Sequence, residues 1–416
     1  MNAREKAFDL LCEIILKKKY SNLALRHGMN DYSGLDRSLI VSIVYGTMQN
    51  YLYVRYLWEH FVSKKLPDDM AVLMDMSIYQ LVFLDKLPDY AVVSEAVDIA
   101  SKKYNGRYKR LINALLRRFL REERRSVDGS SLEKLSIMTS HPLWLVKMWE
   151  HQYGLEIARK ICENDQKVPL QACRVNTLIT DRKTLMKDNG HFTSGRLSPD
   201  GLIYDGEALA QTKEYEEGKI TIQDEASQCV AYYLNPKPHE RILDVCAAPG
   251  TKSTHIAQLM HDEGEIIACD IHKHRVELIE NSLKRLHISC VHPMVSDGTK
   301  AQEVFEHESF DRILLDAPCS GYGVLKRKND IKVHMQSSDM DEIIPLQQTL
   351  LESVSPLLKK GGRLVYSTCT LNKKENEKQI ESFLKKHDDF SCEKMQTIFP
   401  YEYESDGFFM AALVKK

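Results

Sequence analysis

The sequence predicts a multidomain protein in which an all-α domain and a small α+β domain precede an α/β domain built on a parallel sheet. Three observations support this. The chain has 416 residues, more than one hydrophobic core usually organises. Apolar residues recur at helical spacing through residues 1–125. After residue 223, strand-like apolar runs alternate with helical patterns, which is typical of a parallel sheet covered by helices on both faces.

Residues 1–125 are expected to form the helical domain, because several amphipathic helices of this length can enclose a core of their own. Helical spacing is clear at Leu10, Leu11 and Ile14. Near the end of this domain, residues 102–125 contain ten Lys or Arg residues and two Glu residues. Such a cluster indicates either a contact surface for phosphate backbones or a solvated helix face. The net charge of −2 by itself points to no partner.

Residues 126–140 lack sustained periodicity and are expected to form a linker. A helix is expected to follow it, with Pro142 at a favoured first-turn position. Residues 141–222 combine short strand-like runs (QACRVNTL, LIYDG, KITIQD) with a helix around 181–188, which predicts a small α+β domain. Residues 223–416 are expected to form the α/β domain.

Strand-like runs in the α/β domain predict five parallel strands, and a sixth run, DGFFMAALVKK, could pair at or near an edge. The five runs are RILDV (241–245), EIIACD (265–270), CVHPMVSD (290–297), DRILLDAP (311–318) and GRLVYST (362–368). Ligands of open parallel sheets bind outside the carboxyl ends of the strands. Polar or reactive residues occupy those ends: Cys246–Lys252, Asp270, Asp297, Asp316–Cys319 and Ser367–Cys369. A single Asp after a strand can also be a helix cap, but five such ends together favour a site.

The loop after the first of these runs has the features of a cofactor loop. Gly250 lets the backbone approach a ligand without a Cβ atom in the way. Asp270 follows 20 residues later, a separation at which an acid can accept hydrogen bonds from ribose hydroxyls. The sequence has no G-x-G-x-x-G for a pyrophosphate. A nucleoside cofactor without phosphates fits better, and S-adenosylmethionine is the commonest of these.

The ten cysteines of the chain include two that suggest covalent chemistry. No two are spaced as CxxC, so no metal site is expected, and in a chain without a signal-type leader they are expected to be reduced. No apolar stretch approaches the roughly 20 residues that span a bilayer. We therefore expect a cytoplasmic protein with no membrane association. Cys319 and Cys369 each follow a strand-like run, which would bring two thiols to one edge of the sheet.

Three segments carry a resemblance to a known family. DVCAAPGTKS, DAPCSGYGVLKRKNDIK and LVYSTCTLNKKENE resemble the diagnostic motifs of the RNA cytosine-5 methyltransferase family, and HPLWLVKMW, RVNT and ITIQDEAS resemble its shorter upstream motifs. The leader is similar to the NusB-like domain of the RsmB type of bacterial rRNA enzyme, through SIYQLVFLDKLPDYAVVSEAVDIA and RLINALLRRF. Thr251 stands where the family usually has a second Gly, and Asn329 where it usually has Pro. Because threonine restricts the loop backbone, we expect the Thr251 difference to affect cofactor affinity before any other property.

The resemblance implies a Rossmann-like class I methyltransferase domain with assigned site residues. Cys369 would be the nucleophile, Cys319 would assist product release and Asp316 would hold the base, whereas related DNA enzymes use the Pro-Cys thiol. Cofactor-binding positions would be Cys246, Ala247, Ala248, Pro249, Gly250, Thr251, Lys252, Asp270, Arg275, Asp297 and Asp316. Arg275 would pair with a cofactor carboxylate or lie on the surface. Lys252 and the run Lys326-Arg327-Lys328 are candidates for positive potential near the thiols. Of the two, the run is expected rather to contact RNA phosphate.

The implied reaction is methyl transfer from S-adenosylmethionine to carbon 5 of a specific cytosine in 16S rRNA, through a covalent cysteine–cytosine intermediate. The partner would be 16S rRNA before or during small-subunit assembly, bound by a monomer. Two alternatives stay open. The same chemistry could act on tRNA or another RNA, or the chain could be a non-catalytic RNA-binding module related to antitermination factors.

Overall fold

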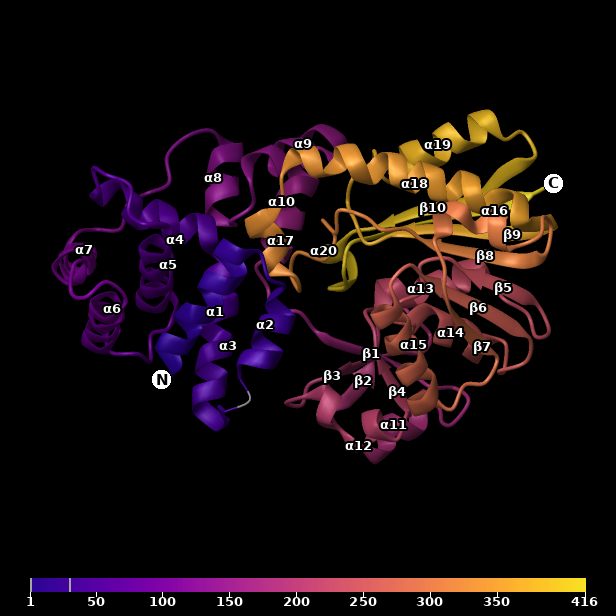
Figure 1. Cartoon of the computed structure of the whole chain (residues 1–416), viewed down its shortest axis with the longest axis horizontal. Coiled ribbons are helices and arrows are strands. Elements are labelled where there is room, and N and C mark those ends of the chain that lie inside the picture. Colours follow the sequence, from indigo (N-terminus) through magenta and orange to yellow (C-terminus); the bar gives the residue numbers. More distant parts are fainter. Residues whose placement is uncertain (1, 30) are drawn as a thin grey trace. The chain divides into compact units, whose positions relative to one another are not determined.

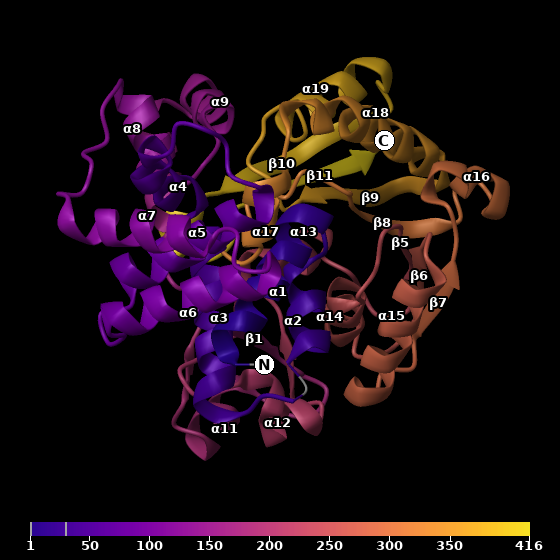
Figure 2. The same cartoon turned by 60° about the vertical axis from the view of Figure 1, so that its left-hand side comes forward.

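The computed structural model of the protein describes residues 2–29 and 31–416. Its chain forms two compact units (Figures 1 and 2). The first contains the residues up to Lys167 together with Leu325–Ser337, and the second contains Val168–Val324 and Ser338–Lys416. Within the described ranges, no helix combines the length and the apolar character needed to cross a membrane.

The first unit is helical, as the sequence predicts. Its elements are α1 (Ala3–Lys17), α2 (Ser21–Gly28), α3 (Gly34–Gln49), α4 (Tyr51–Trp58), η1 (Glu59–Phe61), α5 (Asp68–Phe83), α6 (Asp89–Lys103), α7 (Lys109–Arg121), α8 (Ser131–Met138), α9 (Leu143–Tyr153), α10 (Leu155–Asn164) and α17 (Asn329–His334). Helix α5 is buried on all sides from Met70 to Gln80, so it is the central helix of the bundle. Its one buried carboxylate, Asp75, accepts hydrogen bonds from Arg55 Nε (2.9 Å) and Trp58 Nε1 (2.8 Å).

The segment expected to be a linker, residues 126–140, contains helix α8. Ser130 and Glu133 form a reciprocal capping box at its start. The helix was not predicted because its apolar pattern is too short to show helical periodicity. Helices α9 and α10, which the sequence assigned to the α+β domain, belong to the helical unit. Their apolar side chains, including the fully buried Trp149, pack against helices; α9 contacts α8 and α10.

The motif around Cys319 continues into the helical unit through α17. His334 Nε2 lies 2.8 Å from the carbonyl oxygen of Ile14, and Ser21 Oγ donates to Asp330 Oδ1 at 3.1 Å. In the run Lys326-Arg327-Lys328, which the sequence makes a candidate for phosphate contact, Lys326 is buried. Among its three residues, only Lys328 is fully exposed.

The second unit begins with the predicted small α+β domain. Its antiparallel sheet has the order β2-β3-β1-β4. The strands are β1 (Gln171–Val175), β2 (Phe192–Ser194), β3 (Gly201–Tyr204) and β4 (Ile220–Ile222), accompanied by α11 (Arg182–Asp188), η2 (Leu209–Gln211) and α12 (Lys213–Glu216). Strand β2 was not predicted, because three residues carry no usable periodicity.

The rest of the second unit is a seven-stranded sheet of order β10-β11-β9-β8-β5-β6-β7. Its strands are β5 (Arg241–Asp244), β6 (Glu265–Asp270), β7 (Val291–Val295), β8 (Phe310–Asp316), β9 (Leu358–Thr368), β10 (Phe390–Ile398) and β11 (Phe408–Lys415). The five predicted strands pair in parallel. The sixth run, β11, inserts antiparallel between β9 and β10, one strand from the edge. Strand β10 was not predicted, because this edge strand is exposed and polar over most of its length.

Helices cover both faces of the large sheet (Figure 1). The covering elements are α13 (Glu225–Leu234), α14 (Thr251–Leu259), α15 (Lys273–Leu286), η3 (Gly298–Lys300), α16 (Ala301–Val304), η4 (Ser337–Asp339), α18 (Met340–Val354), η5 (Ser355–Leu357), α19 (Glu377–Lys386) and α20 (Pro400–Tyr403). Successive strand residues supply opposite cores: Ile242 packs with α13–α15, and Leu243 packs with α18 and α19. Strand order reverses at β5, whose neighbours are β6 and β8, so the carboxyl ends of β5 and β8 form the switch point where ligands bind.

Candidate active site

The loop between β5 and α14 is tightly folded. The N–H of Ala247 donates to the carbonyl of Cys269 at 2.7 Å, the Ala248–Pro249 peptide bond is cis, and the N–H of Gly250 donates to the carbonyl of Ala247 at 2.7 Å. Gly250 has a φ of +97°, and a Cβ atom there would lie 3.2 Å from Ile279 Cγ2, so glycine is required. The predicted loop residues Cys246 to Lys252 therefore lie together at the carboxyl end of β5.

Asp244 closes β5 beneath this loop. Its carboxyl group is fully buried and accepts a hydrogen bond from Ser253 Oγ at 2.6 Å. Burial, with some contribution from the nearby Asp316 and Asp270, raises the pKa of Asp244 to about 7. Sequence reasoning passed over this residue because a buried acid at a strand end looks like any other turn residue.

The acids that follow β6 and β7 lie at the predicted edge, with local partners of their own. Asp270 is almost fully buried; its Oδ1 accepts from the N–H of His272 (3.1 Å), and its Oδ2 lies 3.1 Å from Arg275 Nη1. Arg275 also donates to the carbonyl of Ala248 at 3.2 Å. Arg275 thus ties α15 to the loop and to Asp270, and its pairing with a cofactor carboxylate stays a prediction. Asp297 caps the turn after β7 through Thr299, and these hydrogen bonds lower the pKa of Asp297.

Lys252 and Asp316 connect the ends of β5 and β8. Lys252 Nζ donates to Asp316 Oδ2 at 2.7 Å, and Ser367 Oγ, from the end of β9, donates to Asp316 Oδ1 at 2.7 Å. Burial by itself lowers the pKa of Lys252, but the Asp316 carboxylate more than offsets this and the net shift is upward. Cys369 adds to the upward shift, so the ammonium group interacts electrostatically with that sulfur as well.

The two predicted thiols meet at this point. The Sγ atoms of Cys319 and Cys369 are 3.3 Å apart, although the residues are 50 positions apart in the chain. The hydrogen bond to Cys369, burial and the nearby Glu375 and Asp316 carboxylates raise the pKa of Cys319 well above its usual range. Cys319 is therefore held as a thiol, whereas Cys369 interacts electrostatically with the Lys252 ammonium group.

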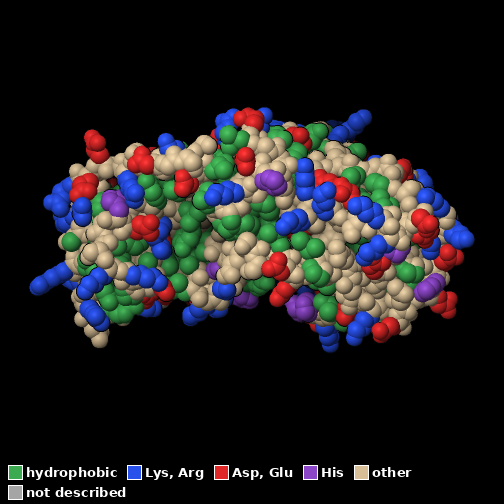
Figure 3. All heavy atoms as spheres, turned by 90° about the horizontal axis from the view of Figure 1, so that it is seen from above, with side chains coloured by type: hydrophobic (Ala, Val, Ile, Leu, Met, Phe, Trp, Pro, Cys, Tyr) green, Lys and Arg blue, Asp and Glu red, His purple; other side chains and the backbone are tan. Residues whose placement is uncertain are grey.

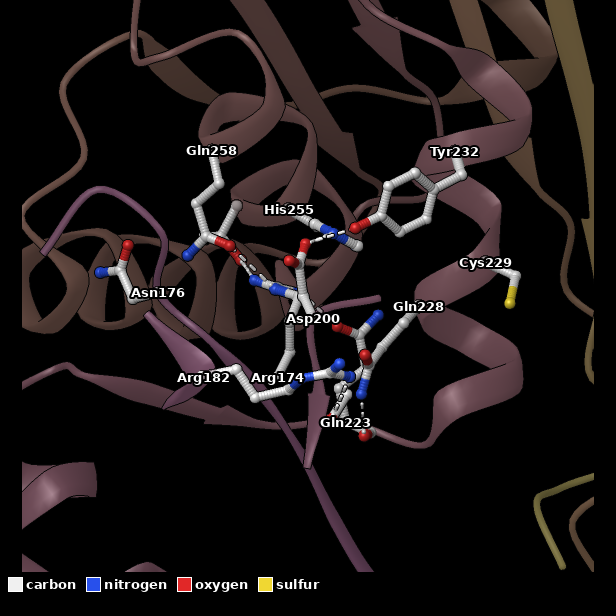
Figure 4. A network of polar contacts seen from close by, with 12 residues as sticks. Arg174, Asn176, Arg182, Asp200, Gln223, Gln228, Cys229, Tyr232, His255 and Gln258 are labelled. Atoms are coloured by element: carbon white, nitrogen blue, oxygen red, sulfur yellow. Dashed lines mark hydrogen bonds and ion pairs between the residues drawn. The ribbon is translucent and has the colours of Figure 1, made fainter. Parts of the chain in front are cut away.

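A buried network behind the cofactor loop was missed by sequence reasoning (Figure 4). Arg174, from β1, is fully buried and donates to Gln258 Oε1 (2.9 Å), the carbonyl of Thr251 (2.8 Å) and Thr254 Oγ1 (3.2 Å), and it also donates to Gln223 Oε1. Burial lowers the pKa of Arg174 to about 9. The small domain thus holds the first turn of α14, where the cofactor loop ends. The RVNT motif was the available signal.

A second part of the network surrounds Asp200. Its carboxylate lies 3.3 Å from Nε2 of the fully buried His255 and accepts a hydrogen bond from Tyr232 Oη (Figure 4). Burial, and then the charge of Arg174, lower the pKa of His255 to about 4. The imidazole is therefore neutral at pH 7, and the Asp200 carboxylate lies beside it.

The predicted basic cluster lies on the surface of the helical unit. All ten Lys and Arg side chains between residues 102 and 125 are exposed, and basic side chains are numerous at the left end of the view in Figure 3. Helix α7 buries its apolar face and presents its basic face to solvent. Some members have partners, since Lys102 pairs with Glu5 (3.1 Å) and Arg118 with Glu122 (2.7 Å). The geometry fits both readings of this surface.

Comparison with protein families gives a match for each of the three parts of the chain. Residues 1–121 match the NusB family, residues 141–207 match the ferredoxin-like domain of RsmF/B-like methyltransferases, and residues 231–414 match 16S rRNA methyltransferase RsmB/F. Among solved structures, the crystal structure of PH0851 covers 99% of each chain with a TM-score of 0.84 at 27% identity. NSun6 from Pyrococcus horikoshii, solved with SFG, covers 66% of this chain and 98% of its own, with a TM-score of 0.60 at 25% identity.

Two curated relatives span the full length of the chain. "Probable ribosomal RNA small subunit methyltransferase B" of Bacillus subtilis (strain 168) is 38% identical, over 100% of this chain and 99% of the relative. The protein of the same name from Synechocystis sp. is 35% identical over 100% of both chains. The chain therefore belongs to the RsmB family of ribosomal RNA small subunit methyltransferases.

Proposed function

We propose that the protein transfers a methyl group from S-adenosylmethionine to carbon 5 of a specific cytosine in 16S rRNA, through a covalent cysteine–cytosine intermediate. The observation that carries this proposal is the pair of sulfur atoms 3.3 Å apart, in unequal electrostatic surroundings, at the switch point of the sheet. Two adjacent thiols, of which one faces an ammonium group, suit a reaction that needs a nucleophile and a helper.

The residues at the sheet edge fit S-adenosylmethionine. Asp270 and Asp297 supply carboxylate acceptors suited to the hydroxyl and amino groups of a nucleoside, and the turn at Gly250 lacks the glycines that a pyrophosphate needs. NSun6, a structural relative, was solved with SFG, an analogue of S-adenosylmethionine. When bound, S-adenosylmethionine supplies the electrophilic methyl group. The loop residues Cys246–Lys252 with Asp270, Asp297 and Asp316 would hold it, and Arg275 would act by fixing Asp270.

Cys369 is the proposed nucleophile. Carbon 5 of cytosine is a poor nucleophile until a thiolate adds to carbon 6, which forms an S–C6 bond and makes carbon 5 enamine-like. The thiolate is the reactive form, and the adjacent Lys252 charge favours it. After methylation, solvent water takes the proton from carbon 5, the C5–H electron pair forms the C5=C6 double bond, the S–C6 bond breaks and Cys369 departs as a thiolate. Cys319, held as a thiol beside it, would assist this release.

Asp316 is the proposed base-holding residue. Lys252 and Ser367 fix both of its oxygens, so its position is set before a base arrives. A carboxylate can accept a hydrogen bond from the exocyclic amino group of cytosine, which uracil lacks. The target base must leave its stack to reach this site, at a cost of a few kcal/mol that an unpaired loop reduces.

The RNA substrate would contact the exposed basic face that includes α7, through phosphate groups and without reading sequence. One chain supplies all of the proposed reacting residues, so the reaction needs no residue from a second subunit, and we propose a monomer. A ribosomal RNA substrate would place the reaction in the cytoplasm, before or during small-subunit assembly.

The test is bisulfite mapping of rRNA and tRNA from cells with and without the protein. We expect one cytosine of 16S rRNA to lose its methyl group, and the purified protein to restore it on that RNA with S-adenosylmethionine. A change confined to tRNA would move the same chemistry to that substrate. If 16S rRNA and tRNA from the deleted strain stay fully methylated, and the purified protein methylates neither RNA, the proposed activity is wrong. The chain would then be a non-catalytic RNA-binding module.

A further inference from the structure

Glu375 is a fully buried carboxylate beside the loop that carries Cys319. Its Oε2 accepts hydrogen bonds from the backbone N–H of Ser320 (2.9 Å) and from Gln347 Nε2 (3.1 Å). Its Oε1 accepts from Ser320 Oγ (2.5 Å) and Asn372 Nδ2 (2.9 Å). A buried carboxylate is costly unless donors surround it, and here four donors do so. Two of the four belong to the residue that follows Cys319.

The neighbouring residue, Asn376, is also fully buried and holds the chain on both sides of Cys369. Its Oδ1 accepts from Thr368 Oγ1 at 2.6 Å, and its Nδ2 donates to the carbonyl of Thr370 at 2.9 Å. Thr368 precedes the proposed nucleophile and Thr370 follows it. Consecutive residues in the turn just before α19 therefore hold the two cysteine loops, one loop each.

A hydrogen-bond relay closes the connection between the loops. Ser320 Oγ and Thr370 Oγ1 are 2.7 Å apart. Because the Ser320 hydroxyl donates its one proton to Glu375, Thr370 is the donor in this contact. Thr370 Oγ1 in turn accepts from the backbone N–H of Tyr322 at 3.2 Å. The loops of Cys319 and Cys369 are thus joined to one another as well as to α19.

We propose that Glu375 and Asn376 are positioning residues that set the separation of the two thiols, Glu375 through the Cys319 loop and Asn376 through the Cys369 loop. Both hold the residues that flank the cysteines: Glu375 accepts hydrogen bonds from Ser320, and Asn376 bonds to Thr368 and Thr370. The inference rests on the proposed function for the roles of the thiols, but the geometry does not depend on it. A displacement of about 1 Å in a reacting group can cost on the order of 100-fold in rate.

The variant Glu375→Gln tests the inference. Each carboxylate oxygen accepts two donors, so an amide in either orientation sets its own N–H groups against two of them. The matched control is Glu381→Gln on the neighbouring helix α19, where the half-exposed side chain forms a surface ion pair with Lys378. We expect kcat for methylation to fall on the order of 100-fold in Glu375→Gln and to be unchanged in the control.

A second readout measures thiol position without RNA or cofactor. Diamide oxidises two adjacent thiols to a disulfide and is itself reduced to the hydrazine, and mass spectrometry of the peptide that links Cys319 to Cys369 gives the rate. Loss of the Glu375 charge would by itself lower the pKa of Cys319 and speed its oxidation. We expect cross-linking of the full chain to be at least about 10-fold slower in Glu375→Gln than in the wild type or Glu381→Gln, which displaced thiols explain and the change of charge does not. Cross-linking at the wild-type rate in folded Glu375→Gln would overturn the inference.

Ser320→Ala covers the case in which Glu375→Gln does not fold. It removes one hydroxyl from a partly exposed residue, and with it the relay between the loops. Slower cross-linking in this variant supports the inference, and an unchanged rate contradicts it. Failure of the proposed function gives a different result, since the wild type would then methylate no RNA while its cross-linking still depended on Glu375.

Discussion

Lys252 Nζ lies 2.7 Å from Asp316 Oδ2, which joins the first turn of α14 to the end of β8 across the switch point of the sheet. Ser367 extends the link to the end of β9. Three strand ends, far apart in the chain, are thereby connected through one carboxylate. The same lysine interacts with Cys369, so a single cation serves the base-holding acid and the proposed nucleophile.

Replacing Lys252 by Met should lower kcat for methylation on the order of 100-fold, because the Cys369 thiolate loses its neighbouring positive charge. The rising limb of the kcat–pH profile should also move to higher pH, since more base is then needed to form the thiolate. Steady-state rates between pH 6 and 10 check both effects. Lys284→Met, at an exposed position on α15, should behave as wild type; an unmoved pH profile in Lys252→Met would contradict the assigned role.

The two cysteines should differ in the product of their loss. Cys369→Ala should form no adduct and transfer no methyl group, because nothing adds to carbon 6. Cys319→Ala should accumulate a covalent protein–RNA complex, because addition proceeds and release is slowed. Denaturing electrophoresis with labelled RNA measures both. Methylation by the Cys369→Ala protein would contradict the assignment of Cys369 as the nucleophile.

Arg174→Met should weaken both the fold and cofactor binding. Loss of a buried guanidinium with four acceptors leaves those acceptors unpaired, which should cost about 3 kcal/mol in the unfolding free energy. Because one acceptor is the Thr251 carbonyl, the Kd for S-adenosylmethionine should rise about 10-fold, or about 1.4 kcal/mol. Urea unfolding and calorimetric titration measure the two effects, with Lys183→Met on the surface of the same domain as the control. An unchanged Kd would show that Arg174 stabilises the fold and does not affect cofactor binding.

Acidification should destabilise the second unit through His255. The folded pKa is about 4 and the reference pKa is 6.5, so the unfolded state binds more protons between these values and stability falls as pH falls through that window. The loss from this group should be about 2 kcal/mol at pH 5 relative to pH 7.5. His255→Gln should lose less stability than the wild type over this range, and the exposed His274→Gln should match the wild type. Urea unfolding at both pH values decides between them.

Charge reversal on α7 should weaken RNA binding without affecting chemistry. Arg117→Glu with Arg121→Glu changes two exposed residues of the basic face. If these residues contact phosphates, Kd for 16S rRNA should rise, and the slope of log Kd against log salt should decrease by about 2. A matched pair of reversals at the exposed Lys284 and Lys385 should have a smaller effect. An unchanged salt slope would show that the α7 surface is a solvated face.

Much of the fold was predictable, because long apolar runs such as that of β8 identify buried parallel strands. Strand β10 escaped prediction because an edge strand with exposed Glu393 and Lys394 needs no apolar pattern. The edge that carries the candidate site was also predictable, since strand polarity dictates where carboxyl ends meet. The partners were not, because pairs such as Ser320–Glu375 and Arg174–Gln258 are 55 and 84 positions apart and form only in the tertiary structure.

The position of β11 also determines when the candidate site can exist during synthesis. The N–H of Gly407, just before β11, donates to the carbonyl of Gly323 at 2.7 Å, and the N–H of Gly323 donates to the carbonyl of Cys369 at 3.0 Å. A ribosome that adds about 5–20 residues per second needs roughly 2–9 seconds to make the 46 residues from Cys369 to Lys415. Until then a nascent chain contains both thiols but lacks the strand that supports their loops. The candidate site therefore assembles only after β11 has been synthesised.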